Sequence, residues 1–128
     1  MERKQISSNT VWEDSYGYSR AVRIGNMVFV SGTTSTDENG IVTGAKNPYA
    51  QTVQALKNIE RALNQAGATL ENVVRTRIFI TNMAFADTIG KAHNEVFGKI
   101  RPATTMVQVQ RLISPDMLVE IEADAVIP

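Results

Sequence analysis

The sequence predicts an α+β fold, a two-layer sandwich in which two helices lie on one face of a mixed β-sheet. Two segments carry apolar residues at the spacing of amphipathic helices, and several others have the β-branched or alternating pattern of strands. Their order along the chain is ββ(β)αβαββ. The length of 128 residues fits a single domain, residues 1–128, that buries a core of its own.

The predicted sheet begins with a hairpin. Residues 20–24 and 27–32 have the pattern of strands, and the Gly-Asn dipeptide between them suits a two-residue turn. The preceding residues, 1–18, look irregular. A short third strand is expected at residues 41–43, after the turn sequence D-E-N-G.

Both predicted helices have recognisable ends. Asn47 suits the N-cap position, Pro48 the first helical position, and Gly67 the C′ position of the first helix. Asn82 is the expected N-cap of the second helix, which ends at Gly98. Apolar residues mark one face of each helix: Val53, Leu56, Ile59, Leu63 and Ala66 in the first, and Phe85, Ile89, Ala92 and Val96 in the second.

Three further strands are predicted, one between the helices at residues 73–81 and two at the end of the chain, at 104–110 and 118–126. The last strand alternates apolar residues with carboxylates, which places the carboxylates on one side. These are Glu120, Glu122 and Asp124. Their side of the strand faces either water or a pocket that needs a carboxylate.

Several strands, such as M-V-F-V, are apolar on both sides, although two helices can cover only one face of the sheet. Burial of the second face against copies of the same chain would remove this apolar surface from water. We therefore expect a symmetric homo-oligomer.

Composition excludes several classes of function. Thirteen basic and thirteen acidic residues cancel, and the pI is about 6.6, so no nucleic-acid partner is expected. There is no cysteine and only one histidine, His93, so neither a disulfide nor a transition-metal site is predicted. No stretch reaches the ~20 apolar residues that span a bilayer. A cytoplasmic protein without a membrane partner is the expectation.

Few catalytic devices are visible in the sequence, which lacks G-x-S-x-G, a glycine-rich phosphate loop and H-E-x-x-H. His93 lies beside the apolar stripe of the second helix, where a boundary residue is more common than a catalyst. Arg75 and Arg77 lie on the same face of one strand, either as a solvated or interface pair or as an anion clamp.

Six motifs spread over the chain from about residue 13 resemble the Rid family. They are Y-S-x-A, V-F-V-S-G, a helix followed by A-G-A, V-V-R-T-R-I-F-I-T, R-P-A-x-x-x-V and L-V-E-I-E-A-x-A. The Rid proteins are reactive intermediate deaminases, also called the YjgF family and formerly labelled translation-inhibiting endoribonucleases. No single motif is specific, but the order and spacing of all six are.

The resemblance implies a chorismate-mutase-like fold and a homotrimer with three small-molecule clefts, each between neighbouring subunits. The deaminating members hydrolyse enamines and imines of small 2-amino acids, such as 2-aminoacrylate, to a 2-keto acid and ammonia. They need neither a cofactor nor a metal.

Carried over to this sequence, the resemblance implies two catalytic residues, Glu120 and Tyr18. Glu120 is suited to orienting or activating the attacking water. The segment Ser31, Gly32 and Thr33 is implied to bind the ligand.

One position departs from the family pattern. Where deaminating relatives have P-A-R, this chain has Thr104, which cannot form a bidentate ion pair with a substrate carboxylate. Met106, near the same position, makes the expected pocket more apolar. Arg101, the nearest cation in sequence, is a candidate replacement, as are Arg20 and Arg77 on neighbouring strands.

Three classes of function follow from these observations. The first is a cofactor-independent hydrolase of enamines, imines or related unstable metabolites that uses Glu120 and Tyr18. The second is a trimer that binds a small ligand without chemistry, which the missing arginine favours. The third, an endoribonuclease or translation inhibitor, has the least support because the chain is neutral and has no histidine pair.

Overall fold

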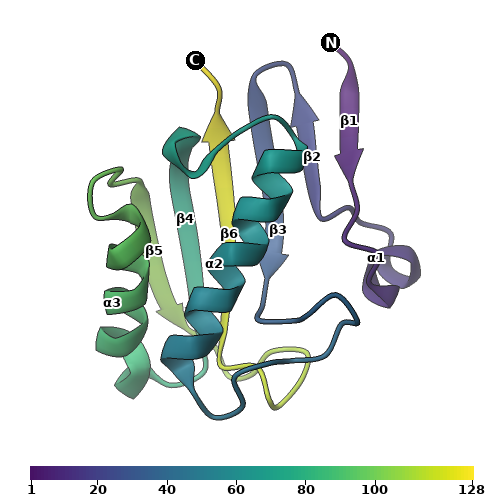
Figure 1. Cartoon of the computed structure of the whole chain (residues 1–128). Helices are drawn as coiled ribbons and strands as arrows, with labels where there is room; N and C mark the ends of the chain where they lie inside the picture. Colours follow the sequence, from purple (N-terminus) through teal and green to yellow (C-terminus); the bar gives the residue numbers. More distant parts are fainter.

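The computed structural model describes residues 1–128 and shows a six-stranded sheet with helices packed on one face (Figure 1). The strand order is β1-β2-β3-β6-β4-β5, and all neighbours are antiparallel except β4 and β5. The elements are β1 Arg3–Ile6, α1 Val11–Tyr16, β2 Ala21–Ile24, β3 Met27–Thr33, α2 Pro48–Gln65, β4 Val73–Ile80, α3 Ala86–Phe97, β5 Ala103–Gln108 and β6 Val119–Val126. Short 3-10 turns, η1 Leu70–Asn72 and η2 Met83–Phe85, precede β4 and α3. The predicted α+β sandwich is confirmed.

Helix α2 begins and ends at the predicted residues. The side chain of Asn47 accepts a hydrogen bond from the Ala50 amide at 3.0 Å, and Pro48 occupies the first turn. Gly67 follows the helix with φ +87°, a conformation that residues with a Cβ rarely adopt. The buried face of α2 packs on β3 and β6 and against α3. The buried residues of α2, of α3 and of the sheet form one hydrophobic core.

Three local predictions were wrong. Residues 1–18 are not irregular, because they contain β1, which pairs with β2, and the short helix α1. The expected strand at 41–43 is only an isolated bridge between Thr36 and Val42. Asn82 caps η2, where its side chain accepts from the Ala84 amide at 2.9 Å, and α3 begins after that turn.

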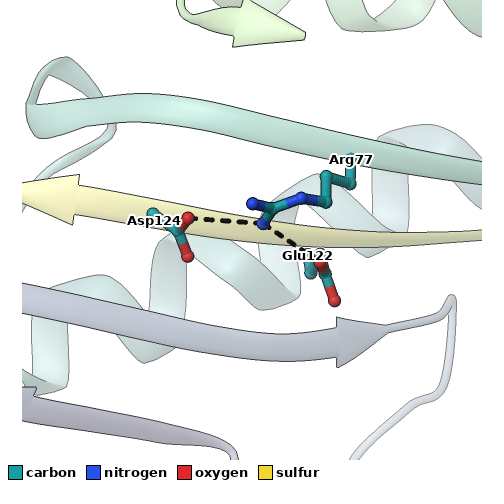
Figure 2. A network of polar contacts seen from close by, with 3 residues as sticks. All are labelled: Arg77, Glu122 and Asp124. Atoms are coloured by element: carbon teal, nitrogen blue, oxygen red, sulfur yellow. Dashed lines mark hydrogen bonds and ion pairs between the residues drawn. The ribbon is translucent and has the colours of Figure 1, made fainter. Parts of the chain in front are cut away.

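Strand β6 shows how the two faces of the sheet differ. Its alternate apolar residues are buried beneath the helices, whereas Glu120, Glu122 and Asp124 lie on the opposite face. On that face Nη1 of Arg77, from β4, lies 3.1 Å from Glu122 and 3.3 Å from Asp124 (Figure 2). Glu122 and Asp124 therefore neutralise a neighbouring arginine, whereas Glu120 forms no ion pair.

The face of the sheet that the helices leave uncovered is called the open face below. Large apolar side chains on it remain accessible, as in Phe29, which is 40% exposed, and Met27, which is 42% exposed. A broad concavity of about 860 Å³ lies along this face and is lined by Val22, Phe29 and Glu122 among others. The expected apolar second face is thus present in the folded chain.

Candidate active-site cleft

A cleft of about 440 Å³ opens at the end of β3, where residues from five parts of the chain meet. Arg20 precedes β2, Glu120 comes from β6, and aromatic residues of α1 form one wall. The lining residues are Thr10, Trp12, Tyr16, Tyr18, Arg20, Ser31, Gly32, Thr34, Thr36, Arg111, Leu112, Ile113, Met117 and Glu120. The cleft therefore combines one carboxylate, two guanidinium groups and apolar walls.

A β-bulge positions the centre of this cleft. Between the pairs Val30–Ala123 and Thr33–Ile121, strand β3 has one residue more than β6. The carboxylate of Glu120 lies directly against Gly32, because a Cβ at Gly32 would be 2.3 Å from Oε2. Only glycine leaves room for the carboxylate in this position.

The Glu120 carboxylate is partly buried and has no hydrogen bond or ion pair within the chain. Burial raises its pKa, the positive charge of Arg20 partly opposes this, and Glu122 adds to the rise. A carboxylate with a raised pKa that faces a cleft is suited to exchange protons with water or a ligand bound there.

Arg20 lies in the same cleft and is held by the bulge. Its Nη2 donates to the Gly32 carbonyl at 2.7 Å and to the Ser31 hydroxyl. Its guanidinium carbon lies 5.7 Å from the ring centre of Tyr18, a cation–π distance. Burial lowers the pKa of Arg20, and the neighbouring Tyr18, Glu13 and Glu120 oppose that shift.

Of the three residues predicted to bind the ligand at the end of β3, two line the cleft and Thr33 does not. Ser31 and Gly32 line the cleft, and the Ser31 hydroxyl also lies 3.1 Å from the Ser19 carbonyl and 3.0 Å from that of Arg20. Thr33 is buried, and its hydroxyl donates to the Ser31 carbonyl at 2.7 Å. Thr33 therefore shapes the bulge and does not line the cleft of its own chain.

Glu13, on α1, holds the residues that precede this helix, among them Thr10 of the cleft wall. Its carboxylate accepts hydrogen bonds from the Ser8 amide and hydroxyl and from the Thr10 hydroxyl. Burial alone would raise the pKa of Glu13, but the Ser8 hydrogen bonds outweigh it and the pKa is lowered. The hydrogen bonds of the Glu13 carboxylate therefore stabilise the segment that leads into α1.

The structure places the other predicted ligand residues elsewhere in the chain. Thr104 and Arg101 line a separate shallow pocket of about 310 Å³, and Met106 packs against the hydrophobic core. The Thr104 hydroxyl lies 2.7 Å from that of Thr76, which lies 2.9 Å from Nε2 of His93. One chain alone does not bring Thr104, Arg101 or Met106 to Glu120.

His93 has the surroundings of a boundary residue. Its ring packs against Phe97 at a tilted angle, with ring centres 4.7 Å apart, and burial lowers its pKa. The described chain contains no group of three or more His, Cys, Asp or Glu side chains arranged to hold a metal. None of its helices has the length and apolar character needed to cross a membrane.

Sequence reasoning missed the aromatic wall and the opposite rim of the cleft. Trp12 and Tyr16 belong to the helix that was predicted as irregular, and Arg111, Leu112 and Ile113 follow β5. One signal was available in the sequence, because Leu112 and Ile113 are adjacent apolar residues directly before the turn S-P-D. In the structure Ile113 is 56% exposed.

Comparison with known proteins identifies the family of the chain. The family model described as Endoribonuclease L-PSP matches residues 12–127. The 3-aminoacrylate deaminase RutC of Acinetobacter baylyi is 37% identical over 108 residues, which is 84% of this chain and 85% of that protein.

Two solved structures share the fold. Rv2704 of Mycobacterium tuberculosis, a member of the YjgF/YER057c/UK114 family, is 50% identical with a TM-score of 0.90, over 98% of this chain and 100% of that chain. TdcF of E. coli, solved with bound serine, is 29% identical with a TM-score of 0.79, over 87% and 88%. The resemblance predicted from the six motifs is confirmed: the chain belongs to the endoribonuclease L-PSP family, also called the YjgF or Rid family.

Proposed function

We propose that the cleft around Glu120 hydrolyses small enamines or imines to a carbonyl compound and ammonia. The observation that carries the proposal is the Glu120 carboxylate, which is partly buried, unpaired and held against Gly32 inside a cleft. A group in this state can take a proton from water and return it without first breaking a bond to the protein.

The proposed reaction begins with an imine bound beside Glu120. The imine reacts in its protonated form: Glu120 accepts a proton from water as the water oxygen adds to the imine carbon, which gives a neutral carbinolamine. Glu120 returns this proton to nitrogen, and the C–N bond then breaks as the hydroxyl proton passes to Glu120 and the C=O bond forms, so that ammonia leaves with the carbonyl product. An enamine enters the same path after protonation on carbon. Tyr18, whose ring lines the cleft and stacks on Arg20, forms one wall of this site.

Two relatives support this substrate class. The relative that is 37% identical is named for deamination of 3-aminoacrylate, which is an enamine with a carboxylate. TdcF holds serine, a small 2-amino acid. Both ligands are small, nitrogen-bearing carboxylates, and a cleft of about 440 Å³ has room for such a molecule.

We further propose that the protein is a homotrimer whose open face is the subunit interface. The apolar side chains of the open face need a cover, and Tyr18 and Ser31 line both its concavity and the cleft. A subunit packed on this face would therefore also close the side of the cleft. In such an assembly Thr104, Met106 and Arg101 could meet Glu120 of a neighbour.

Substitution of Phe29 by glutamate is expected to dissociate the trimer, because it places a charge in the centre of an apolar interface. Light scattering after gel filtration should show a threefold lower mass for Phe29→Glu than for the wild type. The matched control is Ile41→Glu, in an exposed loop that α2 holds through Asn58, and it should leave the mass unchanged. Equal masses for Phe29→Glu and the wild type would contradict the proposed interface.

Ammonia release from 2-aminoacrylate, from 3-aminoacrylate and from a panel of 2-imino acids tests the proposed activity. Each compound is generated enzymatically in the presence of wild-type protein, the Thr104→Arg variant or buffer. The wild type is expected to accelerate hydrolysis of at least one compound. An inert wild type with an active Thr104→Arg variant would overturn the hydrolase and leave the second candidate, a ligand-binding trimer. The neutral side chain at Thr104 is the observation that favours this second candidate.

A further inference from the structure

We infer that Arg20 receives the carboxylate of the ligand in the cleft, so that the arginine absent at position 104 is replaced from the start of β2. The inference rests on the proposed function and adds the residue that selects the ligand. Arg20 and Glu120 lie in one cleft of one chain, with opposite charges.

The hydrogen bonds of Arg20 leave part of its guanidinium unused. Nη2 has two acceptors, the Gly32 carbonyl and the Ser31 hydroxyl. Nε is buried and has no partner, and no hydrogen bond within the chain involves Nη1. The bulge therefore fixes the position of the guanidinium, while Nη1, which is neither bonded nor buried, remains as the donor for a ligand.

The charge of Arg20 is also unpaired. The ion pairs of the chain are those of Arg77 with Glu122 and Asp124, so Arg77 is already neutralised on the open face. Glu13 is engaged by Ser8 and forms no ion pair with Arg20. A partly buried cation without a counter-ion is energetically unfavourable, and binding of an anion beside it removes part of that cost.

Arg20 and Glu120 together define the class of ligand. A carboxylate placed on Arg20 leaves an adjacent nitrogen or water free to approach Glu120, whose charge interacts with that of Arg20. Tyr18, Leu112 and Met117 offer apolar walls for a short side chain. These features fit a small molecule with a carboxylate and a nitrogen on neighbouring atoms.

The remaining arginines are placed less favourably. Arg101 lies in the other pocket of the chain, beside Thr104. Arg111 lines the cleft but is exposed, so water screens its charge. Arg61, which is exposed on α2 and lies outside this cleft, is the control for the loss of a surface arginine.

The test compares the binding of L-serine with that of L-serinamide, which has the same amine and hydroxyl but no carboxylate. Dissociation constants are measured by calorimetry at about pH 6.5, where both α-amines are largely protonated. Wild-type protein is expected to bind serine at least about tenfold more tightly, the typical effect of a charge-assisted hydrogen bond. In Arg20→Gln the two constants should become equal, and in Arg61→Gln the wild-type ratio should persist.

A purely structural role of Arg20 gives a different result, because collapse of the bulge would weaken both probes together and keep their ratio. That outcome overturns the inference, and so does a wild type that binds both probes equally or binds neither. Arg20→Lys provides a second test if the glutamine variant does not fold. It keeps the positive charge and should keep part of the preference for serine.

The two proposals fail separately. A tenfold preference for serine that depends on Arg20, without any release of ammonia, keeps the role of Arg20 and overturns the hydrolase. Ammonia release by a protein with no carboxylate preference keeps the hydrolase and overturns the role of Arg20.

Discussion

Glu120→Gln is expected to lower kcat for ammonia release by about 10²–10⁴-fold, the range for loss of a general acid–base group. The amide fits the same space against Gly32 but cannot take a proton from water. The matched control is Glu60→Gln on the exposed side of α2, which makes the same chemical change in solvent and should keep the wild-type rate. Unchanged kcat in Glu120→Gln would exclude Glu120 as the general base.

The same substitution is expected to raise the melting temperature at neutral pH. Burial raises the pKa of Glu120 above its ordinary value of 4.5, so the folded protein holds this proton more tightly than the unfolded chain does. The stability that Glu120 contributes is therefore present below its ordinary pKa and is lost as the pH rises through the folded pKa. Glutamine removes the cost of a buried charge above that pH. Thermal unfolding of both proteins between pH 4 and pH 8 should show curves that diverge as the pH rises.

Gly32→Ala is expected to lower kcat by about 10²-fold, because the new Cβ would lie 2.3 Å from Oε2 of Glu120 and 2.8 Å from its Cδ. The carboxylate must move, and a displacement of about 1 Å is enough for a loss of that size. The side chain can swing into the cleft, so circular dichroism should show a folded protein.

Gly40→Ala is the control for this glycine. Gly40 has φ +78° and no neighbour within 4 Å of an added Cβ, so alanine there strains only the backbone. The expected cost is about 1–2 kcal/mol of stability without loss of activity. Full activity in Gly32→Ala would show that the position of the Glu120 carboxylate against the bulge does not matter for the reaction.

The parts of the fold that were predicted correctly are those whose signals are local. Helix α2 was placed because Asn47, Pro48 and Gly67 mark its ends and its apolar residues repeat at helical spacing. Strand β1 was missed because Ile6 is its only buried residue, so four residues show no period. Strand β1 exists through its pairing with β2, which the sequence does not display.

In the candidate site, too, local patterns were predicted correctly and contacts between distant segments were not. Alternation along β6 predicted that Glu120 shares a side with Glu122 and Asp124, and the structure confirms that side. It could not show that Arg77 neutralises two of the three, since that pairing depends on the register of β4 against β6. The contact of Arg20 with the bulge likewise joins residues that only the fold brings together.

The most direct test of the whole account is the rate of disappearance of 2-aminoacrylate, generated in situ, at increasing concentrations of wild-type protein and of Glu120→Gln. Keto acid and ammonia are quantified together to confirm that both form in equal amounts. We predict a first-order rate constant that rises linearly with the concentration of wild-type protein and stays at the spontaneous value with Glu120→Gln. A rate constant equal to the spontaneous value at every wild-type concentration would contradict the assignment of this cleft as a site of enamine and imine hydrolysis.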